Sequence, residues 1–207
     1  MRHMTATSTA TSTRVRMTPE GRREQLLDLG VRLLSTRSLE QVSIEVLSEE
    51  AGVSRGLLYH YFGSLREFHV AVVRRAVEDI YAITAPRDID DPLQQLTVSL
   101  GAYLNYVAES YTGYVSLIRA AAGGNEEIQA IYRDARRSLT DRIFEIAGPE
   151  QLAALGVVDS PATRMLLDAW AAMVETAVVA WVADSHGMAR DDLLARLTKS
   201  LPGLLVD

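Results

Sequence analysis

The chain has no cysteine, and its only lysine is Lys199, beside 20 arginines. The absence of cysteine excludes disulfide bonds, thiolate catalysis and cysteine-bound zinc, and it fits a reducing compartment. No uninterrupted apolar run reaches the roughly 18 residues that a membrane-spanning helix needs. The N-terminal segment lacks the apolar core of a secretory signal, so we expect a cytoplasmic protein without a membrane partner.

The 207 residues are 48% hydrophobic and 23% charged, which is typical of a soluble globular protein with one or two domains. The net charge of −6 is unevenly distributed along the chain. Residues 1–81 carry 11 basic and 10 acidic side chains, whereas residues 82–207 carry 10 basic and 17 acidic ones. A nucleic acid is therefore expected to bind the N-terminal part, if it binds at all.

Apolar residues recur at helical spacing along most of the chain, and no period-2 alternation of β-branched residues interrupts them, so we expect an all-α fold. The helices expected from spacing, caps and breakers are residues 18–36, 43–52, 54–61, 64–80, 92–107, 125–144, 160–184 and 190–205. Gly113 and the pair Gly123-Gly124 are expected to break the segment between the fifth and sixth of these. The prolines and aspartates of residues 86–92 mark a boundary. We expect a disordered basic tail at 1–17 and domains at 18–81 and 82–207.

Residues 43–62 carry the most informative pattern in the chain. Two short amphipathic helices are joined at Gly52-Val53-Ser54, where glycine can adopt the positive φ that a tight helix exit needs. This is the layout of a helix-turn-helix, whose second helix lies in the major groove of DNA. A pair of packed helices without DNA contacts would show the same spacing, so spacing alone leaves both interpretations open.

The exposed side of the second helix suits contact with DNA. Arg55 sits at its N-terminus, where free N–H groups favour a phosphate, and it can also donate two hydrogen bonds to guanine. Gly56 has a low helix propensity, which close approach of the backbone to DNA would explain. The positions expected to touch bases or phosphates are Ser54, Arg55, Gly56, Tyr59, His60 and Tyr61.

Three segments in this order, Arg22–Asp28, Ala51–Ser54 and Gly56–Phe62, resemble the DNA-binding domain of the TetR (tetracycline repressor) family. The resemblance covers about 60 residues, from Arg22 to Ile80. It implies an N-terminal three-helix helix-turn-helix domain and a C-terminal helical domain that binds a small-molecule effector and dimerises. It further implies a homodimeric repressor on double-stranded operator DNA, and it adds Ser43 to the residues that contact phosphates or base edges.

The sequence departs from the family pattern in three places. Leu65 stands where the family usually has a phosphate-binding lysine, Ser48 stands where it has a small alanine, and Ser38 stands where it has a glycine. The phosphate contact at Leu65 is therefore lost or moved to Arg66. Two interpretations remain open for the arginines of the N-terminal tail, which are either solvated or form an arm in the minor groove.

The helix expected at 160–184 has three distinct faces. One stripe holds Leu166, Trp170, Met173, Ala177 and Trp181, and a neighbouring stripe of small residues holds Ala169, Ala172, Thr176, Val179 and Ala183. A third, polar face holds Arg164, Asp168 and Glu175. We expect the small-residue stripe, with the final helix, to form half of an intersubunit four-helix bundle. A helix buried within one chain is the alternative.

Large apolar side chains of the C-terminal part can form a pocket for a lipophilic effector. The candidates are Tyr103, Tyr106, Tyr114, Phe144, Met165, Trp170, Met173 and Trp181, with polar contacts expected from Asn105, Arg119 or Glu175. Each candidate can also be an ordinary core residue, and the sequence does not identify the ligand. Since residues 64–81 link the two domains, we expect effector binding to move this helix.

No catalytic motif is present: the chain has no glycine-rich phosphate loop, no Gly-x-Ser-x-Gly and no His-Glu-x-x-His. Its four histidines are not paired at metal-ligand spacing. We therefore expect no enzyme, no metal site and no cofactor. The alternative to a regulator is a helical small-molecule-binding or scaffold protein that does not bind an operator.

Overall fold

The computed structural model describes residues 18–154 and 156–205. The tail expected at 1–17, including Arg14 and Arg16, lies outside the described residues. Within them the fold is all-α, as predicted, with no strand. The elements are α1 (Pro19–Leu33), the 3₁₀ turn η1 (Leu39–Gln41), α2 (Ile44–Ala51), α3 (Arg55–Phe62), α4 (Leu65–Ile83), α5 (Pro92–Glu109), α6 (Tyr111–Ala122), α7 (Glu126–Ala154), α8 (Pro161–Ala183), α9 (Arg190–Ser200) and α10 (Pro202–Leu205).

The helices begin where the sequence places hydroxyl or carboxylate caps. Thr18 accepts a hydrogen bond from the Gly21 amide at 3.1 Å, and Asp91 accepts one from the Leu93 amide at 2.9 Å. Ser160 caps α8 in the same way, and proline follows each of these three caps. A cap satisfies amides that have no partner inside the helix, and proline has no amide to satisfy. The predicted helix starts are therefore confirmed.

Three predicted helix boundaries are wrong. The chain breaks at Ser110, between α5 and α6, whereas Gly113 lies inside α6. The helix expected to end before Gly148-Pro149 kinks at Gly148, whose φ is 66°, and then continues to Ala154. The expected final helix is divided into α9 and α10, because the proline that begins α10 has no amide to continue the hydrogen-bond ladder.

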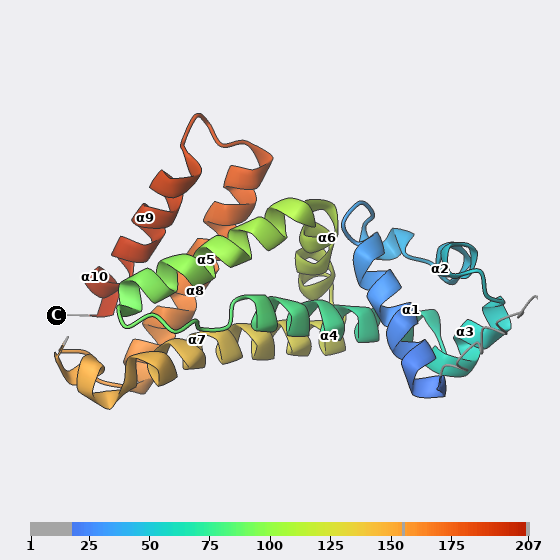
Figure 1. Cartoon of the computed structure of the whole chain (residues 1–207), viewed down its shortest axis with the longest axis horizontal. Coiled ribbons are helices and arrows are strands. Elements are labelled where there is room, and N and C mark those ends of the chain that lie inside the picture. The colour runs from blue at the N-terminus through green and yellow to red at the C-terminus, as the bar shows by residue number, and fades with distance from the viewer. Residues whose placement is uncertain (1–17, 155, 206–207) are drawn as a thin grey trace, which may run out of the picture.

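The helices form two apolar cores that meet along α4. Figure 1 shows α1–α3 at one end of the molecule, α9 and α10 at the other, and α4 running between them. The first core lies among α1–α4 and includes the fully buried Leu58 and Phe68, but it also takes in Leu117 of α6 and Ile128 of α7. The second core lies among α5, α8 and α9. The first core thus extends beyond the residues of the helix-turn-helix.

An arginine fixes α4 against α1. Arg75 of α4 lies 2.7 Å from a carboxylate oxygen of Glu24 and 2.7 Å from one of Asp28, both on α1. A third carboxylate, that of Asp79, lies 3.4 Å away on α4 itself. Several charges in one network hold a geometry better than an isolated surface pair does. The middle of α4 is therefore fixed against α1 of the helix-turn-helix.

The turn after α1 is joined to α6 by direct backbone contact. The Gly113 amide donates to the Leu34 carbonyl at 3.0 Å, and the Leu39 amide donates to Ser116 Oγ at 2.7 Å. A Cβ atom at Gly113 would lie only 2.2 Å from that Leu34 oxygen. No other residue fits here without separating the two segments, which explains a glycine inside a helix.

We expect Gly113→Ala to lower the free energy of unfolding by about 1–3 kcal/mol, because the methyl group overpacks a backbone contact that cannot move aside. Chemical denaturation measures this change. Gly203→Ala is the matched control, since a Cβ there meets nothing within 4 Å. Equal stability of Gly113→Ala and the unmodified protein would contradict the close contact.

Candidate nucleic-acid interface and ligand cavity

The turn between α2 and α3 is closed by backbone geometry and by one hydroxyl group. Gly52 ends α2 in the left-handed conformation, with φ 63° and ψ 37°. Val53 is half-buried against the first core. Ser48 Oγ donates to the Val53 carbonyl at 2.6 Å, which ties α2 to the turn. Sequence reasoning treated this serine only as a departure from a small alanine and missed its role.

One side of α3 is buried and the other is open. Leu58 and Phe62 are buried in the first core, whereas Tyr61 is half-buried. The exposed residues are Ser54, Arg55, Gly56, Tyr59 and His60. A Cβ at Gly56 would meet only Ser54 Oγ, at 4.0 Å, so the backbone of α3 is accessible at this point. The structure thus places five of the six predicted α3 contact residues on one exposed face.

The serines at the N-termini of α2 and α3 accept hydrogen bonds from helix amides. Ser43 Oγ accepts from the Val46 amide at 3.2 Å, and Ser54 Oγ accepts from the Leu57 amide at 3.3 Å. The Ser54 hydroxyl hydrogen can still be donated to a phosphate oxygen, whereas the Ser43 hydroxyl also bonds the Glu45 carboxylate. Both helix N-termini also favour an anion.

In the absence of DNA, the Arg55 side chain pairs with a carboxylate of the protein itself. Its Nη1 lies 3.3 Å from Oε1 of Glu45 on α2, and both side chains are exposed. A backbone hydrogen bond, the Ser43 hydroxyl and the Arg55 charge keep the pKa of Glu45 below its ordinary value, so the pair is ionised at neutral pH. Exposed ion pairs contribute only about 0–1 kcal/mol, so a base or phosphate can replace Glu45 at low cost.

A cavity of about 590 Å³ lies between α4, α5, α7 and α8 and is lined mainly by apolar side chains. Three of the eight predicted pocket residues, Tyr103, Tyr114 and Trp170, line it. The others do not line it. Met165 and Met173 are 63% and 42% exposed on the outer side of α8. The remaining three are Tyr106, Phe144, which lines a separate cavity, and Trp181, whose indole nitrogen donates to the Met188 carbonyl. Of the expected polar contacts, Glu175 lines the cavity, Asn105 pairs with Arg190, and Arg119 is exposed.

Four polar residues meet around the carboxylate of Glu175 at one wall of this cavity. Tyr114 Oη donates to Oε1 at 2.9 Å and contacts Tyr103 Oη at 2.7 Å. Tyr132 Oη donates to Oε2, and Arg136 Nη2 lies 2.5 Å from the same oxygen. Glu175 is therefore neutralised by an arginine and solvated by two hydroxyl groups, which is the condition for burying a charge.

Burial raises the pKa of Tyr103, Tyr114 and Tyr132 well above the ordinary tyrosine value, and the Glu175 charge acts in the same direction. All three hydroxyl groups therefore stay protonated and remain hydrogen-bond donors at any physiological pH. Burial lowers the pKa of Arg136, but Tyr132 and Glu175 outweigh it and leave this pKa raised. Sequence reasoning missed Tyr132 and Arg136, although both lie on the helical face of α7 that also carries Leu139 and Ile143.

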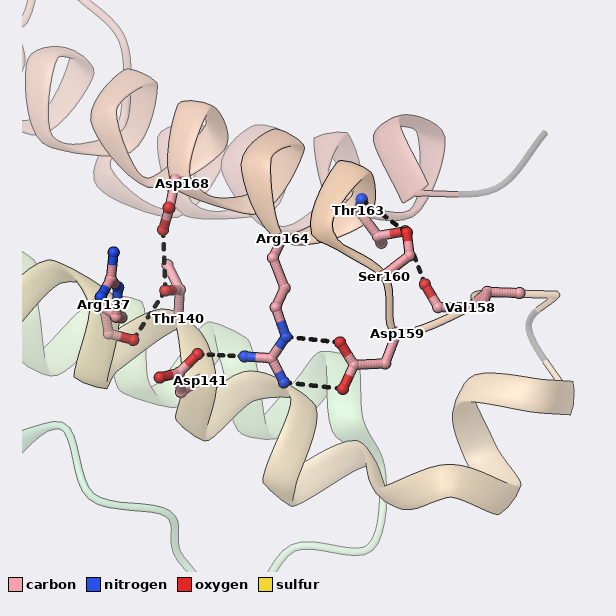
Figure 2. A network of polar contacts seen from close by, with 9 residues as sticks. All are labelled: Arg137, Thr140, Asp141, Val158, Asp159, Ser160, Thr163, Arg164 and Asp168. Carbon is pink, nitrogen blue, oxygen red and sulfur yellow. Dashed lines mark hydrogen bonds and ion pairs between the residues drawn. The ribbon is translucent and has the colours of Figure 1, made fainter.

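The polar face of α8 packs against α7. Arg164 pairs with Asp159 through Nε at 2.6 Å and Nη2 at 2.8 Å, and its Nη1 reaches Asp141 of α7, as Figure 2 shows. One helical turn further on, Thr140 Oγ1 donates to Asp168 at 3.1 Å. With Glu175, these contacts account for all three residues of the predicted polar face.

The opposite side of α8 is apolar and uncovered. The buried residues of α8 are Leu167, Trp170, Val174 and Val178. The exposed residues of the uncovered side include Met165, Leu166, Ala169, Met173, Thr176 and Ala180. By length and composition α8 is the one described helix that could cross a membrane, yet only 22% of its most apolar window is buried. An uncovered apolar stripe of this length is typical of a protein interface. Among the described residues, no group of three or more His, Asp or Glu side chains could hold a metal ion.

Comparison with known proteins gives one consistent result. The family described as "Bacterial regulatory proteins, tetR family" matches residues 26–72, and "Tetracyclin repressor-like, C-terminal domain" matches residues 92–202. The HTH-type transcriptional activator FasR of Mycolicibacterium smegmatis is 25% identical over 133 residues, which are 63% of this chain and 61% of FasR. The HTH-type transcriptional repressor KstR2 of Rhodococcus jostii is 31% identical over 61 residues, which are 30% of each chain.

Solved structures extend the likeness to most of the fold. A tetR-family transcriptional regulator from Streptomyces coelicolor superposes with a TM-score of 0.75 at 27% identity, covering 89% of this chain and 80% of that one. The chain thus spans less than two thirds of FasR and KstR2 but most of this structural neighbour.

We expect Glu175→Ala to destabilise the protein by about 2–4 kcal/mol, because it leaves a half-buried arginine and two tyrosine hydroxyl groups without their acceptor. Urea denaturation followed by circular dichroism measures the loss. Glu150→Ala, at an exposed position of α7, should change the stability by less than about 0.5 kcal/mol. Equal effects of the two substitutions would show that the network does not stabilise the fold.

Proposed function

Because the chain belongs to the TetR family of bacterial regulatory proteins, we propose that it is a repressor that binds a pseudo-palindromic operator as a homodimer and is released by a small lipophilic effector. The observation that carries this proposal is the open face of α3, where Arg55, Gly56 and Tyr59 stand uncovered beside the left-handed turn at Gly52. In a helix-turn-helix this face enters the major groove, and the N-terminal residues of the helix read the bases.

The exposed stripe of α8 supports the homodimer. Small residues such as Ala169 and Ala180 allow two helices to approach closely, and Met165 and Met173 can fill the space on either side. We infer that two copies of α8, together with the α9 of each subunit, form an intersubunit four-helix bundle. Successive major grooves require the two copies of α3 in such a dimer to lie about 34–36 Å apart, which is one turn of DNA.

The path from effector to DNA runs through α4. Its middle is tied to α1 by Arg75, and its C-terminal end lines the cavity with Ile80, Tyr81 and Thr84. An effector that favours a different position of this C-terminal end moves the helix-turn-helix with it. It releases the operator only if it binds the DNA-incompetent state more tightly, with a coupling of typically 1–3 kcal/mol.

The test is a fluorescence titration against the DNA upstream of the protein's own gene and against a selected random pool, each at two salt concentrations. Tight binding that competitor DNA does not displace, with a steep salt dependence, supports the operator-binding dimer. Failure to bind any DNA would favour a helical small-molecule-binding protein instead. The observation that favours this alternative is the exposed Leu65 at the start of α4, where the family has a lysine.

Arg55→Ala should weaken operator binding by about 1–3 kcal/mol and relax base preference at one position of each half-site, because Arg55 reads a base. Arg133→Ala removes an exposed charge from α7, far along the chain from α3, and should leave affinity unchanged. Competition titrations with single-base operator variants check both. An unchanged preference in Arg55→Ala would remove Arg55 from the base-reading residues.

Ala169→Glu should shift the dimer toward monomer by at least tenfold in dissociation constant, because two carboxylates would be buried against each other in the proposed bundle. Sedimentation equilibrium measures the shift. The same change at the exposed Ala154, outside α8, is the control. A dimer unaffected by Ala169→Glu would place the interface elsewhere.

A further inference from the structure

Arg142 of α7 is a buried cation in the wall of the cavity, with 8% of its surface exposed. Its Nη1 donates to the Tyr81 carbonyl at 2.7 Å, and its Nη2 donates to the carbonyl and the hydroxyl oxygen of Thr84 at 2.9 and 2.5 Å. The guanidinium carbon also lies 4.2 Å from the centre of the Tyr81 ring. All these contacts are with the C-terminal end of α4.

Among the described residues, no carboxylate lies within ion-pair distance of Arg142. Arg136, six residues earlier on α7, has Glu175 as its counter-charge. Arg142 has the partial negative charge of the carbonyl groups at the end of α4 and, beyond ion-pair distance, the charge of Glu145 on its own helix. Burial lowers the pKa of the Arg142 guanidinium and outweighs Tyr81 and Glu145, which act in the opposite direction. A buried charge without an ion-pair partner is costly. This site therefore favours binding of an anion, which supplies that partner.

The guanidinium still has donors to offer. Of its five N–H groups, three are used by Tyr81 and Thr84, and Nε makes no hydrogen bond within the described residues. No side-chain nitrogen there is both sealed from solvent and unpaired, so Nε is open to solvent. Nε and Nη2 form the edge of a guanidinium that binds a carboxylate with two parallel hydrogen bonds.

The remaining charges of the cavity do not compete for such an anion. Arg74, Glu78 and Asp134 are exposed at its rim. Glu175 already accepts bonds from Tyr114, Tyr132 and Arg136, so it offers no free charge to a cationic ligand. Arg142 is therefore the one buried, uncompensated charge among the described residues of the lining.

The shape of the cavity indicates the chemistry of the rest of the ligand, beyond its anionic group. Its lining follows α7 from Ile128 to Ile146, roughly 27 Å along the helix axis, and most of that lining is apolar. The lining residues Tyr81, Leu93 and Ile146 are also exposed, so they mark an opening. Ile146 lies one helical turn beyond Arg142. A ligand that enters with its apolar end first thus leaves its head near the guanidinium.

We propose that the effector is an amphipathic anion, a monocarboxylate on a long apolar chain, whose carboxylate pairs with Arg142. This inference rests on the proposed function, and it names the ligand class and the coupling residue. A carboxylate on the Nε–Nη2 edge must share or replace the bonds from Nη2 to Thr84. Since Thr84 ends α4, ligand binding loosens the hold on the helix that carries the helix-turn-helix.

The first test varies only the head group on the unmodified protein. Dodecanoate, 1-dodecanol and dodecyltrimethylammonium have the same apolar chain and differ in charge. Calorimetric titration below their micellar concentrations should show dodecanoate binding at least tenfold tighter than dodecanol, with the cation weakest. Equal affinities, or tighter binding of the cation, would overturn the proposal. Hexanoate should bind much more weakly than dodecanoate, because it fills less of the apolar lining.

The second test removes the guanidinium. Arg142→Met should abolish the preference for dodecanoate over dodecanol while keeping affinity for dodecanol, which also reports that the cavity is intact. Arg142→Lys should retain part of the preference. Arg137→Met, at an exposed position of α7 outside the cavity, should behave as the unmodified protein does. A preference that survives in Arg142→Met would overturn the role of Arg142, and should that variant fail to fold, the head-group series decides.

These binding measurements contain no DNA, so they succeed or fail independently of the operator titration. Where operator binding is established, dodecanoate should release the unmodified protein and Arg137→Met at similar concentrations. Release of Arg142→Met should need at least tenfold more dodecanoate. Equal release of all three would separate anion binding from the movement of α4 and overturn the proposed coupling.

Discussion

The structure depends on the way α4 is held at two points. At one point an arginine of α4 contacts α1, and at the other an arginine of α7 contacts α4. Arg75 ties the middle of α4 to the acids of α1, and Arg142 of α7 holds the carbonyl groups at its last turn. Along its length α4 contributes Phe68 to one core and Ile80 to the other. A rigid helix shared in this way transmits a displacement at one end to the other, because packed interiors do not deform gradually. The exposed face of α3 and the cavity are thus linked through one rigid helix.

The helix α8 presents three sides with different surroundings. Its buried stripe fills the second core, its polar residues pair with α7, and its remaining side is uncovered. Glu175 stands beside that uncovered side and also holds the tyrosines of the cavity wall. The surface proposed for dimerisation and the wall of the ligand site are therefore built on the same helix, about one helix diameter apart.

Local signals in the sequence predicted much of the fold and part of the site. Caps such as Thr18 and Asp91 and the left-handed Gly52 depend on neighbouring residues, so their positions could be inferred without a structure. Met165 and Met173 could not be placed, because helical spacing shows that residues share a face but not which face is covered. Arg142 was missed because an arginine on an amphipathic helix is normally exposed, and its burial follows only from the position of α4.

The contact between Gly113 and the Leu34 carbonyl constrains how the two parts of the molecule can move. Because it joins backbone to backbone without intervening side chains, it leaves no room for sliding, but it permits rotation. With this point fixed, a push on the last turn of α4 turns the helix-turn-helix about a pivot rather than carrying it sideways. The displacement of a residue then grows with its distance from the pivot. In the proposed dimer, two such rotations of opposite sense change both the spacing and the tilt of the two α3 helices, and with them the fit to successive grooves.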